Sequence, residues 1–201
     1  MNFPVQRHNH RNQLPTSGSD LTTSADPIFL KDGAMLLLRP IHVEDVDALI
    51  RAFNRMTPAQ VRARVFHALN ELPEPVARSM CRVDPDETVA LVATDPDGAE
   101  IRGEARVHFD PVTESAELAL AIDPEYTGRG LGRILVEHLI AACRKRDIRE
   151  IWGDTQADNV AMLALTRRLG FSLRREHDEA SLVHFRLDLR TSDTDETASK
   201  G

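Results

Sequence analysis

Apolar positions along the chain recur with two different periods, which predicts a mixture of strands and helices. Short apolar or alternating runs predict strands at 35–39, 88–94, 100–109, 114–122, 148–155, 172–177 and 181–189. Helical spacing predicts helices at 44–56, 58–69 and 76–81, then one that begins at the glycines of 128–132, and one over 158–169. We therefore predict one α/β (α+β) domain over residues 34–189, with a mixed central sheet of six to seven strands flanked by helices.

The two ends of the chain have a different composition from this domain. Residues 1–28 are rich in Asn, Gln, Ser, Thr and Pro, and residues 191–201 are polar, so both are predicted to be disordered tails. Residues 1–26 contain no continuous apolar region typical of a signal peptide, and no run approaches the length of a transmembrane helix. We expect a cytoplasmic protein that does not enter a membrane.

The charge and the cysteine content of the chain exclude some classes of function. The chain has 201 residues, a formal charge of −7 and a pI of about 5.6, which argues against general nucleic-acid binding. Cys81 and Cys143 provide neither a disulfide framework nor a metal-binding spacing and are expected in the core. His8 and His10 lie in the N-terminal tail and make a poor metal site. No metal is therefore predicted.

A glycine-rich segment is the strongest candidate for a binding site. The apolar strand 116–122 precedes Tyr126-Thr127-Gly128-Arg129-Gly130-Leu131-Gly132, and an amphipathic helix follows at once. Glycines let the backbone turn tightly and approach a ligand, and a helix start offers free N–H groups to an anion. The dinucleotide fingerprint fails because Arg133 stands where its last glycine would be, and no Lys-Ser or Lys-Thr pair completes a P-loop. The segment thus predicts a cradle for another phosphate-bearing molecule.

A second motif lies at 158–171. Asp158 or Asn159 can cap a helix, and Arg167, Arg168 and Gly170 suit its C-terminal end. An apolar face is predicted at Val160, Leu163, Ala164 and Leu169. Asn159 has two interpretations at this point: a plain helix cap, or a polar contact to a bound ligand.

Together the two motifs resemble the Gcn5-related N-acetyltransferases (GNAT family). The family's acyl-CoA loop, [Q/R]-x-x-G-x-[G/A], matches 127–132 except at Thr127, and 159–171 resembles its later motif N-x-x-[AM]-x-x-L-Y-x-x-x-G-F. The resemblance implies the GNAT fold and acetyl-CoA as cosubstrate. Thr166 stands where many relatives carry a Tyr that protonates the leaving thiolate, so the general acid is unassigned. The implied cofactor-binding residues are Leu120, Ile122, Thr127, Gly128, Arg129, Gly130, Leu131, Gly132 and Asn159.

Acyl transfer from a thioester to an amine requires a base, because a free lysine amine has a pKa of about 10.4. Our candidate is Glu117, a carboxylate inside an apolar strand, where burial would suit it to base work. A glutamate on a solvated strand face is the competing interpretation. Glu104 is the fallback, and His108 and His138 are weaker, since His138 is expected on the core side of its helix. No Ser-His-Asp or Cys-His constellation is recognisable, which fits direct attack by the amine.

Two segments resemble the acetyltransferase domain of Pat-type bacterial protein-lysine acetyltransferases. They are the long helical stretch between the first two strands, 62–67 in particular, and the strand around Glu117. That resemblance implies Glu117 as the general base and a protein lysine as acceptor, with the substrate near residues 43–82. Arg62 or Arg64 could face it, although both could simply be solvated. A small-molecule amine acceptor and a non-catalytic acyl-CoA-binding regulator remain alternatives. The oligomeric state is not predicted.

Overall fold

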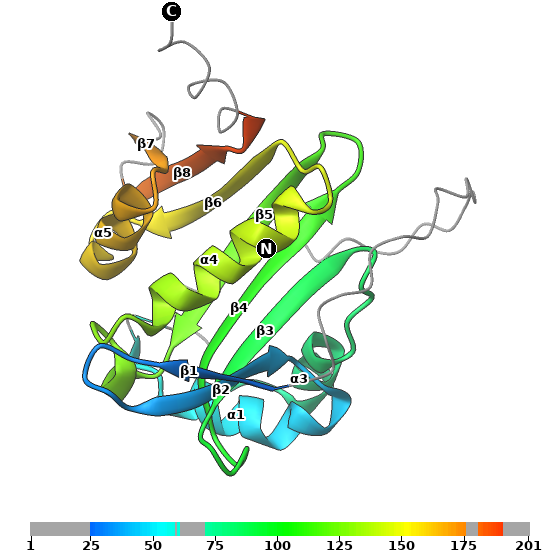
Figure 1. Ribbon diagram of the computed structural model, residues 1–201, viewed down its shortest axis with the longest axis vertical. Coiled ribbons are helices and arrows are strands. Elements are labelled where there is room, and N and C mark those ends of the chain that lie inside the picture. Colours follow the sequence, from blue (N-terminus) through cyan, green and yellow to red (C-terminus); the bar gives the residue numbers. More distant parts are fainter. Residues whose placement is uncertain (1–24, 59, 61–70, 176–180, 191–201) are drawn as a thin grey trace, which may run out of the picture.

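The computed structural model describes residues 25–58, 60, 71–175 and 181–190 (Figure 1). The predicted helix at 58–69, with Arg62 and Arg64, and most of both predicted tails fall outside these residues. The strands are β1 (Asp26–Phe29), β2 (Met35–Pro40), β3 (Thr88–Thr94), β4 (Ile101–Asp110), β5 (Ser115–Ile122), β6 (Glu150–Gln156), β7 (Ser172–Arg175) and β8 (Leu182–Asp188). The helices are α1 (Val46–Arg55), α3 (Glu74–Cys81), α4 (Leu131–Arg144) and α5 (Val160–Arg168), with short 3-10 turns η1 (Val43–Asp45) and η2 (Pro124–Tyr126).

The strands that the structure describes form one sheet of eight, in the order β1-β2-β3-β4-β5-β6-β8-β7. β5 and β6 pair in parallel, and every other neighbouring pair is antiparallel. Helix α4 connects β5 to β6, as a crossover between parallel strands requires. The predicted mixed sheet with flanking helices is confirmed, although the sheet has eight strands rather than six to seven.

The additional strand is β1, whose first three residues lie inside the segment predicted as a disordered tail. Asp26–Phe29 pairs with Met35–Leu38 of β2, so the predicted tail boundary at residue 28 is wrong. Only Ile28 is buried within β1, while Phe29 is 66% exposed. A strand with a single buried side chain leaves almost no periodic signal in the sequence, because its stability comes from pairing with β2.

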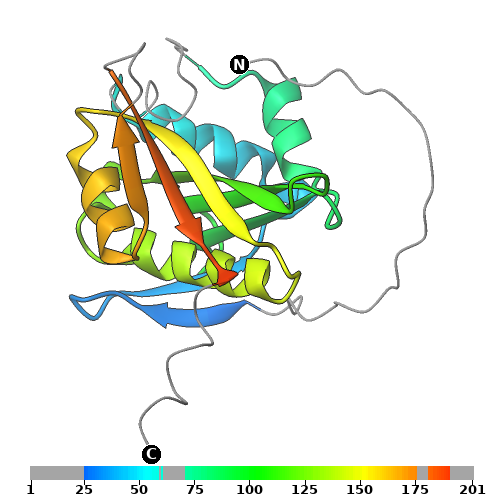
Figure 2. The ribbon, with the colours of Figure 1, turned by 90° about the horizontal axis from the view of Figure 1, so that it is seen from above.

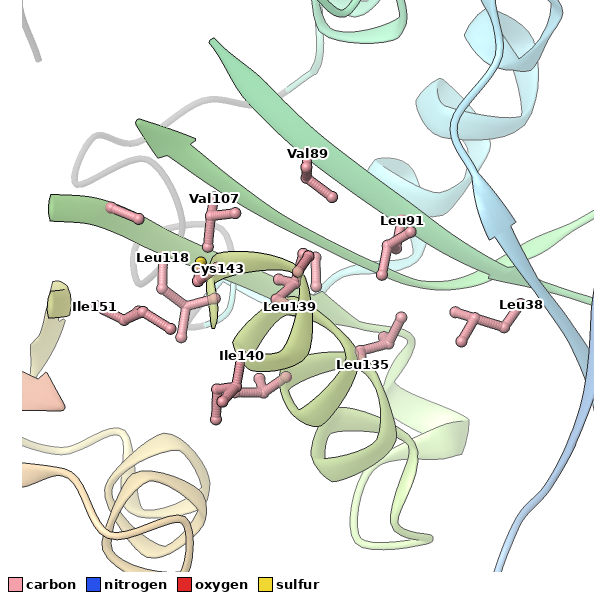
Figure 3. Close-up of a cluster of buried hydrophobic side chains, with 14 of the residues drawn as sticks. Leu38, Val89, Leu91, Val107, Leu118, Leu135, Leu139, Ile140, Cys143 and Ile151 are labelled. Atoms are coloured by element: carbon pink, nitrogen blue, oxygen red, sulfur yellow. The ribbon is translucent and has the colours of Figure 1, made fainter. Parts of the chain in front are cut away.

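Helices cover both faces of the sheet (Figure 2), and each face has its own core. Helix α4 packs Leu135, Leu139 and Cys143 against the strands (Figure 3), and all three are 0% exposed. Helices α1 and α3 form the other core with Ala90 and Val92 of β3. Figure 3 shows the α4 side chains meeting Val107, Leu118 and Ile151, so α4 holds β4, β5 and β6 together.

Two helix faces differ from prediction. His138 is exposed rather than on the core side, and its Nδ1 lies 2.8 Å from the carbonyl oxygen of Ile134, while the adjacent Leu139 and Ile140 are buried. In α5, Val160 is 73% exposed, and the side that packs on the core carries Met162, Leu165 and Leu169. A short helix with several apolar residues offers more than one apolar stripe, so periodicity alone does not select the stripe that packs.

Candidate active site

The parallel strands β5 and β6 are paired over only part of their length. Their register runs from Ser115–Glu150 to Glu117–Trp152, and from Leu118 onward β5 pairs with β4 alone. The next residue of β6 is Gly153, where an added Cβ would lie 2.9 Å from the Leu118 carbonyl oxygen. Beyond this point the two strands separate, which leaves one edge of β5 available to a ligand.

The glycine loop begins where β5 ends and leads into α4. Gly128 has φ +78° and Gly130 has φ +97°, a region that glycine enters without steric cost. Gly130 caps α4, and its carbonyl accepts the first helical bond, from the N–H of Ile134 at 3.2 Å. The N–H groups of residues 131–133 therefore have no carbonyl partner within the helix and lie at its positive end. The loop and the helix start therefore have the conformation that an anion cradle requires, and anion binding there stays a prediction.

A cavity of about 570 Å³ opens beside this loop. Its walls come from the end of β5, the glycine loop, the start of α4 and most of α5. Gly132 is needed here, because an added Cβ would lie 3.3 Å from Leu165 and 3.4 Å from Leu120. The lining is largely apolar on one side and polar near the helix start. The residues that line it are Lys31, Met56, Gln60, Leu120, Ala121, Ile122, Tyr126, Thr127, Gly128, Gly130, Gly132, Arg133, Asp158, Asn159, Val160, Ala161, Met162, Ala164, Leu165 and Arg168.

Seven of the predicted cofactor-binding residues line this cavity: Leu120, Ile122, Thr127, Gly128, Gly130, Gly132 and Asn159. The other two do not. Leu131 is 0% exposed and packs in the core beneath α4. The Arg129 guanidinium binds Asp32, with Nε 2.6 Å from Oδ2, and lies 4.4 Å from the centre of the Tyr126 ring. The Arg129 side chain thus anchors the glycine loop to the turn between β1 and β2.

Sequence reasoning missed Lys31, which follows β1 in the turn to β2. Its N–H donates to the Arg129 carbonyl at 3.1 Å, and its stem packs over Gly130, where an added Cβ would lie 3.3 Å from Lys31 Cγ. Arg133 and Arg168 also line the cavity. Lys31 reaches the loop from a distant part of the chain, so no local motif could have indicated it. Three cationic side chains thus line the cavity, of which Arg133 also pairs with Glu137, and positive charge in a cavity wall favours a phosphate-rich ligand.

The structure shows the hydrogen bonds of two polar residues in the second motif. Asn159 caps α5: its Oδ1 accepts from the Met162 N–H at 3.2 Å, and its Nδ2 donates to Thr155 Oγ1 at 3.0 Å. A ligand contact by Asn159 stays a prediction. Thr166 is 1% exposed, and its hydroxyl donates to the carbonyls of Met162 and Leu163. Its hydroxyl proton is thus engaged within the helix.

The candidate base Glu117 is exposed, so the expectation that it is buried is wrong. Its neighbours Ala116 and Leu118 face the α4 core, and Glu117 points to the opposite face of the sheet. The described part of that face at β5 carries no helix, because α1 and α3 lie toward β2–β4 (Figure 2). The base role itself stays a prediction.

Glu104, the fallback, is buried at 3% exposure on the same face of the sheet as Glu117. Its Oε1 lies 2.5 Å from Nε of Arg106. The ion pair occupies the carboxylate and burial shields it from solvent, so Glu104 is poorly placed to meet a substrate amine. His108, also on this face, lies with Nδ1 3.0 Å from Thr88 Oγ1. Of these candidates, Glu117 is the accessible one.

Neither cysteine has the properties of a nucleophile. Burial raises the pKa of the Cys81 thiol to about 11 and that of the Cys143 thiol to about 12. A buried neutral thiol is unreactive. Within the ranges that the structure describes, no group of three His, Cys, Asp or Glu side chains could hold a metal ion, and no helix is long and apolar enough to span a membrane.

Comparison with known proteins assigns this arrangement to a family. The model of the acetyltransferase (GNAT) family matches residues 48–171, more than half of the chain. Acetyltransferase PA5475 of Pseudomonas aeruginosa is 30% identical over 162 residues, which are 80% of this chain and 87% of that protein. The chain belongs to the GNAT family. The GNAT domain of PAT from S. lividans shares 25% identity at a TM-score of 0.74, over 82% of this chain and 97% of that domain.

A shorter match links this GNAT protein to an enzyme with a named acceptor. The [ribosomal protein bS18]-alanine N-acetyltransferase of Escherichia coli is 42% identical over 59 residues, which are 29% of this chain and 40% of that enzyme. The shared assignment across these relatives is acetyltransferase. The protein is an acetyl-CoA-dependent N-acetyltransferase.

The cavity fits acetyl-CoA by the chemistry of its walls. The N-terminal amides of α4, with Lys31, Arg133 and Arg168 nearby, suit the phosphates, and Gly132 keeps the helix start free of a Cβ. The apolar wall of Leu120, Ile122 and the α5 residues suits the pantetheine arm. Acetyl-CoA supplies the acetyl group as a thioester. The residues of the chain bind it and present the amine to it.

Proposed function

We propose that this protein transfers the acetyl group of acetyl-CoA to lysine side chains of proteins, with Glu117 as the general base. The reaction replaces the carbon–sulfur bond of the thioester with a carbon–nitrogen bond, and the attacking amine must lose a proton. Glu117 accepts that proton directly or through one water. The proton that the departing sulfur needs comes from solvent, because the Thr166 hydroxyl is bonded within α5.

The observation that carries this proposal is the position of Glu117. It forms the last pair with β6 before the strands separate, on the face opposite α4, and it is exposed. Leu120, the first β5 residue that lines the cavity, lies three residues further on, about 10 Å along an extended strand. Small-molecule sites are usually concave and enclose their ligand. An exposed base beside the cofactor cavity suits a long side chain presented by another protein.

The relatives differ in the acceptor that their names give, and one of them supports a protein acceptor. The E. coli relative acts on an alanine of a ribosomal protein, so an N-terminal amine is a second candidate on that observation. Pat-type enzymes, which the sequence resembles, act on lysine side chains. We place the reaction in the cytoplasm, because both cysteines are free and buried, as suits a reducing compartment.

The test compares the wild type with Glu117→Gln, which keeps the size of the side chain and removes the basic oxygen. The wild type is expected to release thiol from acetyl-CoA with peptides that carry an internal lysine, and intact-mass analysis should find one acetyl group on that lysine. Glu117→Gln should lose at least roughly a hundredfold in kcat, the lower range for a general base, and should keep its affinity for acetyl-CoA. Glu87→Gln, an exposed glutamate before β3, is the matched control.

Three results would contradict the proposal. Full activity of Glu117→Gln would remove the base assignment. Turnover on small amines alone, or on N-terminal amines alone, would contradict the proposed lysine acceptor. Tight binding of acetyl-CoA with no turnover on any amine would favour a non-catalytic acyl-CoA-binding regulator, an alternative suggested by Thr127 and Thr166 in place of the usual family residues.

A further inference from the structure

The register of the sheet places a row of polar and aromatic residues beside Glu117. In-register neighbours in a sheet point to the same face. Ala116 and Ile151 are paired and are both 0% exposed in the α4 core, so the next pair, Glu117 and Trp152, lies on the opposite face. Following the register outward from this pair gives the row Thr88, His108, Glu117, Trp152, Arg186 and Ser172.

Trp152 belongs to a second group on this face, built from β6 and β8. Its ring stacks on His184, with centroids 5.6 Å apart and planes at 28°. Asp154 is two residues after Trp152 on β6 and is in register with His184. Nδ1 of His184 lies 3.0 Å from Oδ1 of Asp154, and both side chains remain about one third exposed, at 30% and 34%. The hydrogen bond fixes the imidazole, and the stacked imidazole in turn supports one face of the indole.

The carboxylates and the indole on this face can attract a cationic ligand. Arg186 is paired with Glu150 and Arg106 with Glu104, so carboxylates on neighbouring residues neutralise these two guanidinium groups. Arg174, in register with His184 on the far side of the group, also lies on this face and is exposed. Glu117 makes no ion pair with any residue that the structure describes. The Asp154 carboxylate accepts a hydrogen bond from the imidazole of His184 on the same face. An indole ring attracts a cation through its face, and carboxylates within a few ångströms add to that attraction.

We propose that Trp152, Asp154 and His184 form the acceptor-binding site, which holds the lysine side chain of a protein substrate. This rests on the function proposed above and specifies which residues select the amine. The aliphatic part of the lysine packs on the indole of Trp152, and its ammonium group lies between Asp154 and Glu117. Trp152 and Asp154 select and position the amine, and Glu117 alone takes its proton.

Trp152 is the one tryptophan in the chain, so its fluorescence reports on this site without catalysis. The experiment titrates a lysine-containing peptide into the Glu117→Gln variant in the presence of CoA and follows the emission. We expect a saturable change with the lysine peptide and none with the same peptide carrying norleucine, which has the stem without the charge. Asp154→Asn should lower the affinity for the lysine peptide roughly tenfold, which corresponds to about 1.4 kcal/mol of binding free energy.

Steady-state kinetics on the enzyme with Glu117 intact provides the second measurement. Trp152→Leu should raise KM for the lysine peptide roughly tenfold, with kcat and the affinity for CoA little changed, and Trp152→Phe should restore part of the loss because phenylalanine keeps a weaker π face. Phe29→Leu, which alters an aromatic side chain that is 66% exposed on β1, is the matched control.

The two proposals can fail separately. An equal fluorescence response to lysine and norleucine peptides, or an unchanged KM in Trp152→Leu, would overturn the acceptor site even if proteins are acetylated. Saturable, charge-dependent binding at Trp152 without any protein acetylation would leave the acceptor site standing and overturn the proposed function. A circular dichroism melt of each variant verifies that it is folded, and Asp154→Asn gives an independent reading if Trp152→Leu does not fold.

Discussion

At the scale of single residues, the close packing of β6 against β5 and Phe185, at the point where β5 and β6 separate, requires a glycine at position 153. A Cβ at this position would lie 2.4 Å from Cζ of Phe185 and 2.9 Å from the Leu118 carbonyl oxygen. Phe185 is 1% exposed and has little room to move. We predict that Gly153→Ala lowers the free energy of unfolding by about 2–3 kcal/mol, as overpacking of a filled core does. Urea denaturation monitored by circular dichroism measures it.

Gly98→Ala is the matched comparison for this substitution. Gly98 has φ +75° and nothing within 4 Å of an added Cβ, so the cost there should be about 1–2 kcal/mol of backbone strain without a clash. Adding Phe185→Leu to Gly153→Ala should recover part of the loss, because it removes the nearest ring atoms. Strictly additive effects of the two substitutions would show that the ring is not the obstacle.

Thr166 illustrates how the structure decides between chemical and structural roles. Its position in the second motif suggested a place for a general acid, yet its hydroxyl is buried and bonded to two carbonyls of α5. We predict that Thr166→Val leaves kcat within about twofold and that the free energy of unfolding falls by about 1 kcal/mol, the value of one hydrogen bond. Steady-state kinetics and denaturation test both values. A loss of kcat by a hundredfold with unchanged stability would instead assign Thr166 a part in the chemistry.

At the scale of whole elements, the sequence predicted best where residues adjacent in the chain determine the structure. The glycine loop and α4 follow from three glycines and an apolar repeat. The prediction that Glu117 is buried was wrong, because its burial depends on whether a helix covers that face of β5. β1 and Lys31 were missed because pairing and proximity to the loop arise between segments distant in sequence.

The turn between β1 and β2 also makes a prediction about the cofactor. Lys31 lines the cavity, and its stem covers Gly130, while the Arg129 guanidinium is held by Asp32. Lys31→Met keeps most of the stem and removes the charge. We predict that it weakens CoA binding roughly three- to tenfold, as loss of about 0.7–1.4 kcal/mol of phosphate attraction would. Isothermal titration calorimetry at two salt concentrations should also show a smaller salt dependence in the variant.

Lys145→Met, at the opposite end of α4, is the control for a change in net charge. Repeating the titration with 3′-dephospho-CoA identifies the phosphate concerned. If Lys31→Met loses affinity equally for both ligands, Lys31 contacts the pyrophosphate. If it loses affinity for CoA alone, Lys31 contacts the 3′-phosphate. Equal affinity of the wild type and Lys31→Met for CoA at low salt would show that the β1–β2 turn does not take part in binding.

At the scale of the molecule, the site lies where two parts of one sheet meet. β1–β5 and β6–β8 are joined by three parallel residue pairs and by α4, which contacts β3, β4 and β5 and packs with Ile151 of β6 in one core. The cofactor cavity and the proposed acceptor site lie on either side of this junction. In the proposed reaction, acetyl-CoA and the amine therefore approach the junction from opposite faces of the sheet without competing for the same surface.

The core beneath this junction contains Cys143, whose thiol links the stability of the whole fold to pH. Burial raises its pKa from 9.0 to about 12, so above pH 9 the unfolded chain loses this proton while the folded protein keeps it. The stabilising contribution is complete below pH 9 and is lost as pH rises toward 12. We predict that the urea midpoint of the wild type falls between pH 9 and 11 and that Cys143→Ala, though less stable at neutral pH, shows a shallower fall. Other groups titrate equally in both proteins, so the difference between the two slopes isolates the thiol, and parallel slopes would contradict its burial in the core.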